Sequence, residues 1–261
     1  MALCKTEAII LRSYNFSESS KIVTVLTKQH GKSRVVAKGA RRPKSRFCGG
    51  LEPVTHTLIV YYRKEDRELH TLSQSDIITP FQCLHSDLER LSYASALCEL
   101  ADRLSPAEVE NRALFALMLE TLGAMESAQP EDLIVLLWFF ELRMVTFLGF
   151  KPELKTCIGC RRKATGNTLG LSLAKGGVLC PACAVKDADA CALSQEVLIY
   201  LQHLQTVRTE NVTREPPPRG ATSEIDNLIQ AFLKYHTDDL RDIKSLHVWD
   251  RVHSRLPTGE S

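Results

Sequence analysis

Hydrophobic and polar residues alternate in short runs over the first eighty positions of the chain. Five runs are rich in β-branched and aromatic residues and are bounded by glycine, proline or charged residues, which is typical of β-strands. These runs are EAIILR (7–12), KIVTVLT (21–27), GKSRVVAKG (31–39), VTHTLIVYYR (54–63) and ELHTLSQSDII (68–78). Five short strands with no helical pattern between them predict a small barrel or sandwich over residues 1–80.

After residue 80 the hydrophobic spacing changes to three or four residues, as expected for helices. Leucines and alanines at this spacing predict a first helix over about 83–104. The sequence SPAE then predicts the start of a second helix, because Ser105 can cap it, Pro106 suits its first position and Glu108 can complete a capping box. Gly123 can end this helix.

A third helix is expected between Pro130 and Gly149, which completes a helical domain over 81–150. It contains the most apolar run of the chain, LIVLLWFF, whose eight residues are too few to span a bilayer. Glu141 and Arg143 follow directly. We therefore interpret the run as the centre of a buried helix and expect no association with membranes.

Beyond the third helix, a short glycine- and cysteine-rich module at 151–190 precedes two further helical patterns. Ser194 can cap a helix that runs to about Val207, and three consecutive prolines then exclude a helix. A last helix is predicted from one apolar face, formed by Ile225, Leu228, Ile229, Phe232 and Leu233. We expect helices within 191–250 to pack on the helical domain and the tail at 251–261 to be frayed.

The sequence gives no sign of secretion or of catalysis. Met1 leads directly into the first expected strand without a signal peptide, so we expect a reducing cytosol, where clustered cysteines more often bind metal than form disulfides. There is no Walker A loop, HExxH, GxSxG or dinucleotide fingerprint. We therefore expect that the protein is not an enzyme.

Two pairs of cysteines, CIGC and CPAC, lie nineteen residues apart in the module. This pattern is typical of four-cysteine zinc sites, in which each pair forms a tight turn that points two thiolates at one ion. The predicted zinc ligands are Cys157, Cys160, Cys180 and Cys183. Four soft ligands leave no position for water, so the ion is expected to be structural. An iron site of the same geometry is the alternative.

Positive charge is concentrated in one stretch of the expected strands. Nine lysines and arginines and no acid lie between Ser19 and Leu51, whereas the remaining chain holds 24 basic and 31 acidic residues. A local field of one sign raises the local concentration of anions. A solvated loop is the simpler explanation, but the length of the acid-free run favours a site for a polyanion. The candidate residues are Lys32, Arg34, Lys38, Arg41, Arg42, Lys44 and Arg46.

The stretch SESSKIVTVLTKQHGKSRVVAKGARRPKSRFCGGLEPVT (17–55) resembles the N-terminal signature of the RecO family of bacterial DNA repair and recombination mediators. In that family a strand reading K-I-V-x-x-L-T is followed by a glycine turn and by A-K-G-A-R-R-x-x-S-R. This chain matches the signature nearly residue for residue. The helical middle, the cysteine pairs and LRDIKS (240–245) also fall where the family has counterparts.

The resemblance implies an α+β protein with an N-terminal OB-fold, which is a five-stranded barrel, then a helical domain and a zinc-binding module that only some members carry. It implies binding of single- and double-stranded DNA, annealing of complementary strands, and help in loading RecA onto protein-coated single strands. It also implies RecR and single-stranded-DNA-binding protein as partners, a cytoplasmic location at the nucleoid, and a monomer in the absence of partners.

An OB barrel binds nucleic acid across a strand face and its adjoining loops, so the seven candidate basic residues are expected to contact phosphates. Phe47, and Phe16 or Tyr14, can stack on bases, although a place in the barrel core is the expectation for each. Two other functions remain open. One is an adaptor that docks protein partners and binds DNA only secondarily, and the other is a zinc-ribbon enzyme that acts on nucleic acid.

Overall fold

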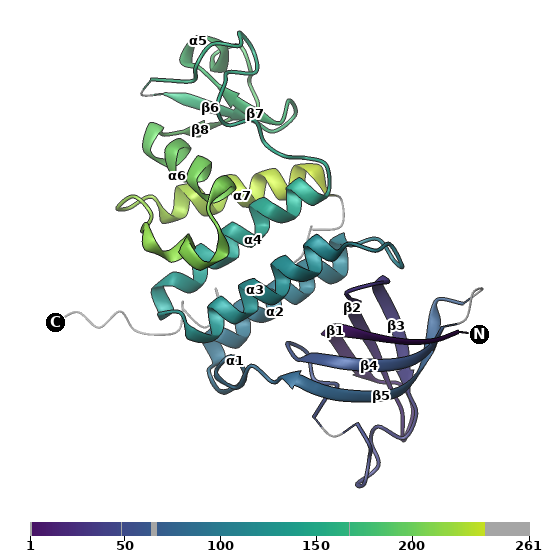
Figure 1. Ribbon diagram of the computed structural model, residues 1–261. Helices are drawn as coiled ribbons and strands as arrows, with labels where there is room; N and C mark the ends of the chain where they lie inside the picture. Colours follow the sequence, from purple (N-terminus) through teal and green to yellow (C-terminus); the bar gives the residue numbers. More distant parts are fainter. Residues whose placement is uncertain (1, 48, 64–66, 167, 238–261) are drawn as a thin grey trace, which may run out of the picture. The chain divides into compact units, whose positions relative to one another are not determined.

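The computed structural model describes the chain in two compact units (Figure 1). The described residues are 2–47, 49–63, 67–166 and 168–237. The N-terminal unit is Met1–Leu133 and the C-terminal unit is Ile134–Asp242. The boundary lies inside the range 81–150 expected for one helical domain, so the third expected helix belongs to the C-terminal unit.

Three expectations for the end of the chain lie wholly or partly outside the described residues. They are the frayed tail at 251–261, the end of the helical range 191–250, and the segment 240–245.

Five strands form the first part of the N-terminal unit, at the positions expected from the hydrophobic alternation. They are β1 (Ala2–Asn15), β2 (Lys21–Thr27), β3 (Gly31–Ala37), β4 (His56–Arg63) and β5 (Leu69–Thr79). Their order is β1-β2-β3-β5-β4, and β1 also pairs with β4, so the sheet closes on itself as a barrel (Figure 1). β3 and β5 run parallel, whereas the other neighbours are antiparallel. The prediction of five N-terminal strands in an α+β protein is confirmed.

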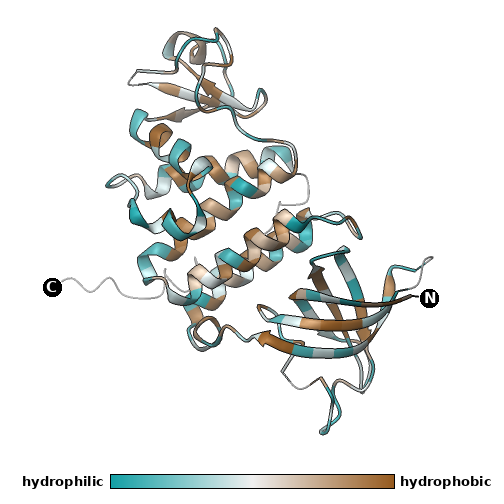
Figure 2. Cartoon of the chain, viewed as in Figure 1, coloured by the Kyte–Doolittle hydropathy of each residue, from teal (hydrophilic) through white to brown (hydrophobic). Residues whose placement is uncertain are grey.

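The five strands enclose one apolar core. Hydrophobic residues alternate with hydrophilic ones along them (Figure 2), which places one set of side chains inside. The core consists of Ala8, Ile10, Val23, Val25, Val35, Ala37, Phe47, Leu51, Ile59, Tyr61 and Leu72. Phe47 and Leu51 come from the connection between β3 and β4, so this loop is anchored in the core.

Three helices complete the N-terminal unit. They are α1 (Gln82–Ser86), α2 (Leu88–Leu104) and α3 (Arg112–Ser127). The predicted start of the second helix at Ser105 is wrong, because the residue that caps α3 is Asn111. Its side-chain oxygen accepts a hydrogen bond from the N–H of Leu114 at 2.9 Å. The predicted end at Gly123 is also wrong, since α3 continues through it.

The segment 105–110 does not begin a helix because it pairs with β3. The N–H of Glu108 donates to the carbonyl of Lys32 at 2.8 Å. Gly31 permits this approach, since a Cβ at that position would lie 1.9 Å from the carbonyl oxygen of Val109, and its φ of +66° also favours glycine. A tertiary contact therefore overrides the local capping signal.

The C-terminal unit contains three long helices. They are α4 (Leu133–Phe147), α6 (Gln195–Thr206) and α7 (Thr222–His236). As expected, Ser194 caps α6, since its hydroxyl accepts a hydrogen bond from the N–H of Val197 at 3.3 Å. The five apolar residues predicted to form one face of α7 are all buried.

The apolar run of α4 is the centre of a buried helix, as the sequence predicted. Trp138, Phe139 and Phe140 are all buried. Across the described part of the chain, helices long and apolar enough to cross a membrane are absent.

Between α4 and α6 the chain forms a small module of short elements, which we call the cysteine module (151–193). Its strands are β6 (Leu169–Ser172), β7 (Gly177–Leu179) and β8 (Ala190–Leu193), paired in the order β7-β6-β8, and its helix is α5 (Pro181–Ala184). Its buried apolar side chains are fewer than those of the barrel and include no aromatic ring among the described residues. A module of this kind needs stabilisation beyond its own core.

Candidate nucleic-acid interface and metal centre

The four predicted ligands come together in the cysteine module. The sulfur atoms of Cys157, Cys160, Cys180 and Cys183 all lie within 4.8 Å of one another. The Sγ atoms of Cys160 and Cys180 are 3.8 Å apart. A tetrahedral ion with metal–sulfur bonds of about 2.3 Å spaces its ligands by roughly 3.8 Å. The geometry therefore fits one metal ion with four sulfur ligands and no open coordination position.

Each cysteine pair lies on a turn that backbone hydrogen bonds close. In the first turn the N–H of Arg161 donates to the carbonyl of Cys157 at 2.7 Å, and the N–H of Cys157 donates to the carbonyl of Arg162 at 2.8 Å. In the second turn the N–H of Cys183 donates to the carbonyl of Cys180 at 2.9 Å. The backbone thus fixes the direction of each pair of sulfurs.

The electrostatics of the four sulfurs favour a cation among them. Burial raises the pKa of Cys157, but backbone N–H donors, including that of Cys180 at 3.2 Å from its Sγ, lower it to about 6. Hydrogen bonds with Cys180 and Cys157 raise the pKa of Cys183 to about 12, because its proton is held between sulfurs. A bound cation takes the place of that proton and lets all four sulfurs ionise. The donor set therefore fits a soft metal ion.

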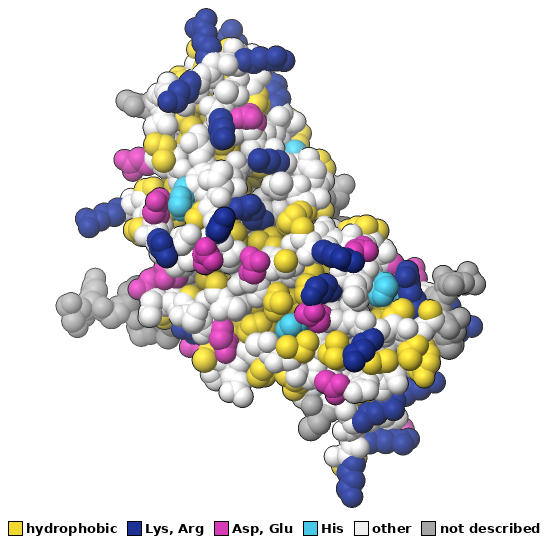
Figure 3. Space-filling view, viewed as in Figure 1, with side chains coloured by type: hydrophobic (Ala, Val, Ile, Leu, Met, Phe, Trp, Pro, Cys, Tyr) yellow, Lys and Arg dark blue, Asp and Glu magenta, His cyan; other side chains and the backbone are white. Residues whose placement is uncertain are grey.

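The loop between β3 and β4 carries most of the basic residues predicted to contact DNA. Those in the loop are Lys38, Arg41, Arg42, Lys44 and Arg46, and all five are exposed. The loop is folded into turns, in which the N–H of Arg42 donates to Gly39 at 3.1 Å and the N–H of Ser45 donates to Arg42 at 3.0 Å. Phe47 and Leu51, each 3% exposed, hold its end in the barrel core. The backbone of the loop is thus fixed while its charges face solvent (Figure 3).

In the described parts of the chain, none of these five residues forms an ion pair with a carboxylate. Arg41 donates to the carbonyl of Ser17 at 2.9 Å. The guanidinium of Arg46 lies 5.0 Å from the centroid of the Phe47 ring. The five charges are therefore not neutralised within the N-terminal unit and are available to an anion.

Two lysines of the same acid-free run are already paired. Lys21 contacts Glu52 at 2.9 Å and Lys28 contacts Glu7 at 2.6 Å. Each of these pairs lowers the positive potential that the lysine presents to solvent. The run of nine basic residues is therefore not uniform, and its strongest positive field lies on the loop.

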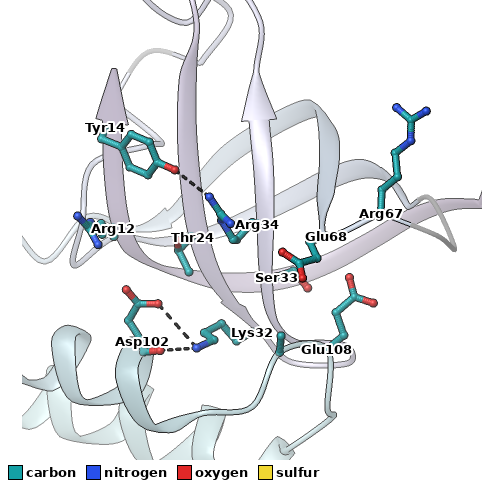
Figure 4. A pocket seen from close by; sticks show the side chains of 11 residues that line it. Arg12, Tyr14, Thr24, Lys32, Ser33, Arg34, Arg67, Glu68, Asp102 and Glu108 are labelled. Atoms are coloured by element: carbon teal, nitrogen blue, oxygen red, sulfur yellow. Dashed lines mark hydrogen bonds and ion pairs between the residues drawn. The ribbon is translucent and has the colours of Figure 1, made fainter. Parts of the chain in front are cut away.

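The remaining two candidates, Lys32 and Arg34, line a groove of about 520 Å³ on the barrel (Figure 4). The strand register places Arg12, Thr24 and Arg34 in one row across β1, β2 and β3. Arg34 donates to the hydroxyl of Tyr14 at 3.0 Å, and the guanidinium of Arg12 lies 5.6 Å from the centroid of the same ring. The groove thus combines cations with an aromatic side chain.

Carboxylates also face this groove and reduce its positive charge. Lys32 donates to the backbone carbonyl of Asp102 and lies 3.9 Å from the carboxylate of that residue. Burial raises the pKa of Glu108, but hydrogen bonds from Arg63 at 2.9 Å and His70 at 2.5 Å hold it below its usual value. Glu108 is therefore ionised at neutral pH, and Arg34 is better placed than Lys32 to attract an anion.

The structure separates the aromatic candidates. Phe47 belongs to the barrel core, as expected. The same expectation is wrong for Phe16, which is 60% exposed, and for Tyr14, which lines the groove. Sequence reasoning missed Arg12 and Arg67, which also line the groove. Both lie outside the acid-free run, and the signal that would have found Arg12 is its register with β2 and β3.

Two family models together match most of the chain. They are Recombination protein O N terminal, over residues 1–81, and Recombination protein O C terminal, over residues 85–247. The two matches cover the barrel, the helices and the cysteine module.

Similar curated proteins from three bacteria are each named DNA repair protein RecO. The protein of Symbiobacterium thermophilum is 35% identical over 259 residues, which cover 97% of this chain and 99% of that protein. The Roseiflexus sp. protein is 37% identical over 256 residues, with 98% and 88% covered. The Salinibacter ruber protein is 34% identical over 266 residues, with 100% and 98% covered. The similarity therefore extends over nearly the full length of these proteins.

Proposed function

Because the chain belongs to the RecO family of DNA repair proteins, we propose that it is a mediator of DNA repair and recombination that binds the phosphate backbone of single- and double-stranded DNA. The exposed cations of the β3–β4 loop contact phosphates, and Arg34 extends this surface into the groove. Phosphate contacts carry no sequence information, so binding is independent of sequence. The closed five-stranded barrel supports the assignment of an OB-fold, whose strand face and loops bind nucleic acid.

The observation that carries this proposal is that the β3–β4 loop presents unpaired positive charges on an anchored backbone. Its five basic side chains are exposed and have no carboxylate partner among the described residues, while its backbone is anchored by Phe47 and Leu51. An anchored loop loses little conformational entropy when it binds, so more of the electrostatic attraction appears as affinity.

Annealing follows from the same charges and needs no catalytic group. Two complementary strands repel each other through their phosphates, and a protein that neutralises part of this charge lets base pairing proceed. In the proposed pathway the protein also helps to load RecA onto protein-coated single strands in the cytoplasm. RecR and single-stranded-DNA-binding protein are its proposed partners, and the chain itself is proposed to be a monomer without enzymatic activity.

The proposed ion of the cysteine module is zinc. Four thiolates in a closed tetrahedron suit Zn²⁺, which has no geometric preference of its own and forms structural sites of this kind. Zinc would hold the two turns together and supply no reactive position. Elemental analysis of the purified chain is expected to give one zinc per molecule, whereas iron in that amount would contradict the assignment.

The adaptor role remains a second candidate because of one apolar feature of the barrel. Leu3 and Tyr62 lie opposite each other on β1 and β4, and their side chains are 62% and 40% exposed. An exposed apolar pair on a strand face is suited to contact with another protein. If docking is the main role, loss of the loop charges leaves partner recruitment and most biological activity intact.

The proposed function is tested by fluorescence anisotropy with a labelled single strand over a series of salt concentrations. The test variant is Arg41→Ala/Arg42→Ala/Lys44→Ala/Arg46→Ala. Each lost phosphate contact lowers the salt slope by about 0.7, so the four changes are expected to lower it by about 3 and to reduce annealing with it.

A matched control removes four exposed basic residues of the C-terminal unit, which are Arg208, Arg214, Arg219 and Lys234. It lowers the net charge by the same amount and is expected to bind as the wild type does. A loop variant that binds and anneals like the control would contradict the proposal.

A further inference from the structure

The cysteine module carries a second concentration of positive charge, which DNA binding by the barrel does not use. Between residues 151 and 189 there are seven lysines and arginines and three acids. Arg161, Arg162 and Lys163, which we call the basic triplet, directly follow the ligand Cys160, and all three are exposed. Basic side chains project from this module in the space-filling view (Figure 3).

Two of the three acids are already engaged elsewhere. The carboxylate of Glu153 accepts the backbone N–H groups of Lys155 and Thr156 at 2.7 and 3.0 Å. Asp187 pairs with Lys175 at 3.1 Å. No ion pair connects the basic triplet with a carboxylate among the residues that the structure describes. The triplet therefore presents its charge to solvent.

The backbone of the basic triplet is tied to the metal-binding turn. The N–H of Arg161 donates to Cys157, the carbonyl of Arg162 accepts from Cys157, and Lys163 forms an antiparallel bridge with Thr156. Arg161 has a φ of +60°, a conformation that glycine and asparagine adopt more readily. An exposed arginine is thus held in a strained position directly beside a ligand, which is a pattern found at functional sites.

A structural role for this charge is the main competing explanation. Four thiolates around one divalent ion carry a net charge of about −2, which nearby cations can offset. The Cys157 sulfur accepts a hydrogen bond from the backbone N–H of Cys180 at 3.2 Å, however, so part of this negative charge is offset without the triplet. Three exposed cations also exceed what two negative charges require. Neutralisation alone therefore does not explain the triplet.

We infer that the basic triplet is a second phosphate-binding surface, which contacts the backbone of a nucleic-acid strand independently of the β3–β4 loop. The class of ligand rests on the proposed function. Guanidinium groups suit bidentate contact with phosphate, and Lys163 adds a point charge beside them. With one such surface on each compact unit, a single molecule can hold two strands.

The test compares Arg161→Ala/Arg162→Ala/Lys163→Ala with Arg208→Ala/Arg214→Ala/Arg219→Ala, a control of equal charge in the same unit. Both full-length variants are titrated with the labelled single strand over the salt series. The triplet variant is expected to lose about 2 from the salt slope, since each contact contributes about 0.7, and the control is expected to lose nothing. A variant that combines the loop and triplet substitutions is expected to have a salt slope lower by about 5 than that of the wild type.

Metal content and the rate of metal release to a chelator are measured in the same variants. A reduced salt slope with unchanged metal content supports the inference. An unchanged slope overturns it, and faster metal release would then assign the triplet to the metal centre. If the triplet variant loses both DNA binding and metal, the single change Lys163→Ala separates the two explanations. Lys163 forms its backbone bridge with Thr156 and not with a metal ligand. A slope lowered by about 0.7 supports the inference, and an unchanged slope overturns it.

Failure of the proposed function gives a different result. The wild type would then show no salt-dependent DNA binding, or the loop variant would bind DNA as tightly as the wild type. Absence of salt-dependent binding by the wild type overturns both proposals. If the loop variant loses DNA binding and the triplet variant does not, only the proposal of the second surface is overturned.

Discussion

Two exposed basic turns of this molecule are held in place by different means. The β3–β4 loop is fixed by Phe47 and Leu51, which are buried in the barrel core. The basic triplet directly follows Cys160 and is fixed by backbone hydrogen bonds with Cys157, and the structure places both cysteines among four close sulfurs. Both arrangements present cations on a fixed backbone, but one rests on apolar packing and the other on four cysteines positioned to bind a metal ion.

The difference follows from the amount of core that each region can build. The barrel encloses eleven clustered core residues drawn from all five of its strands and from the β3–β4 loop. The cysteine module has strands of three or four residues and cannot bury a comparable core. Short segments of this size usually need a metal or disulfides to fold. The two basic turns should therefore respond in opposite ways to metal removal and to core mutation.

The largest expected effect is that of removing the metal. Structural zinc contributes about 10–16 kcal/mol to the folding of finger peptides, so chelation or Cys157→Ser is expected to unfold the cysteine module and leave the barrel intact. Hydrogen exchange should show loss of protection in β6 and β7 and none in β2 and β3. The control is Cys191→Ser, a cysteine outside the ligand set. Retained protection of β6 and β7 in Cys157→Ser would show that the module does not depend on metal.

A smaller effect is expected when the apolar anchor of the β3–β4 loop is removed. Phe47→Ala deletes a core side chain and is expected to destabilise the N-terminal unit by about 3–5 kcal/mol, while metal content stays unchanged. The matched control is Phe16→Ala, which removes a side chain that is 60% exposed and should change stability by about 0.5 kcal/mol or less. Denaturant unfolding measures both. Equal effects of the two changes would mean that Phe47 is not an anchor.

The smallest effect concerns the ion pair that joins segment 105–110 to the barrel. Hydrogen bonds from Arg63 and His70 lower the pKa of Glu108 in the folded state. Its contribution to stability is therefore complete above the unfolded pKa of about 4.3 and is lost as the pH falls through the folded pKa. Glu108→Gln is expected to cost less than about 1 kcal/mol at pH 7 and to remove this acid dependence. A pH profile of the unfolding free energy that matches the wild type would exclude this contribution.

Local signals were sufficient for most of the fold. Alternation located the five strands, and Ser194 and the apolar face of α7 located two helices. The same kind of signal failed at Ser105, because segment 105–110 pairs with β3 and Asn111 caps the helix instead. That contact joins Lys32 to Glu108, which are 76 positions apart in the sequence, so no local pattern can predict it.

In the candidate sites, too, local sequence patterns predicted local features and missed those that depend on tertiary contacts. The spacing of the cysteines predicted the cluster of four sulfurs that can hold a metal ion, because ligand spacing is local. The groove on the barrel was not predicted, since Arg12 reaches it through the register of β1 with β2 and β3. The sequence also did not reveal that Lys21 and Lys28 are paired with carboxylates while the loop cations are not.

The central claim is that DNA contacts the β3–β4 loop. Hydrogen exchange of the unmodified full-length chain, with and without an unlabelled single strand, tests it most directly. Peptides that cover residues 37–47 are expected to gain protection when DNA binds, and to lose that gain at high salt, because the contact is electrostatic. Protection confined to other parts of the chain, with residues 37–47 unchanged, would contradict the account.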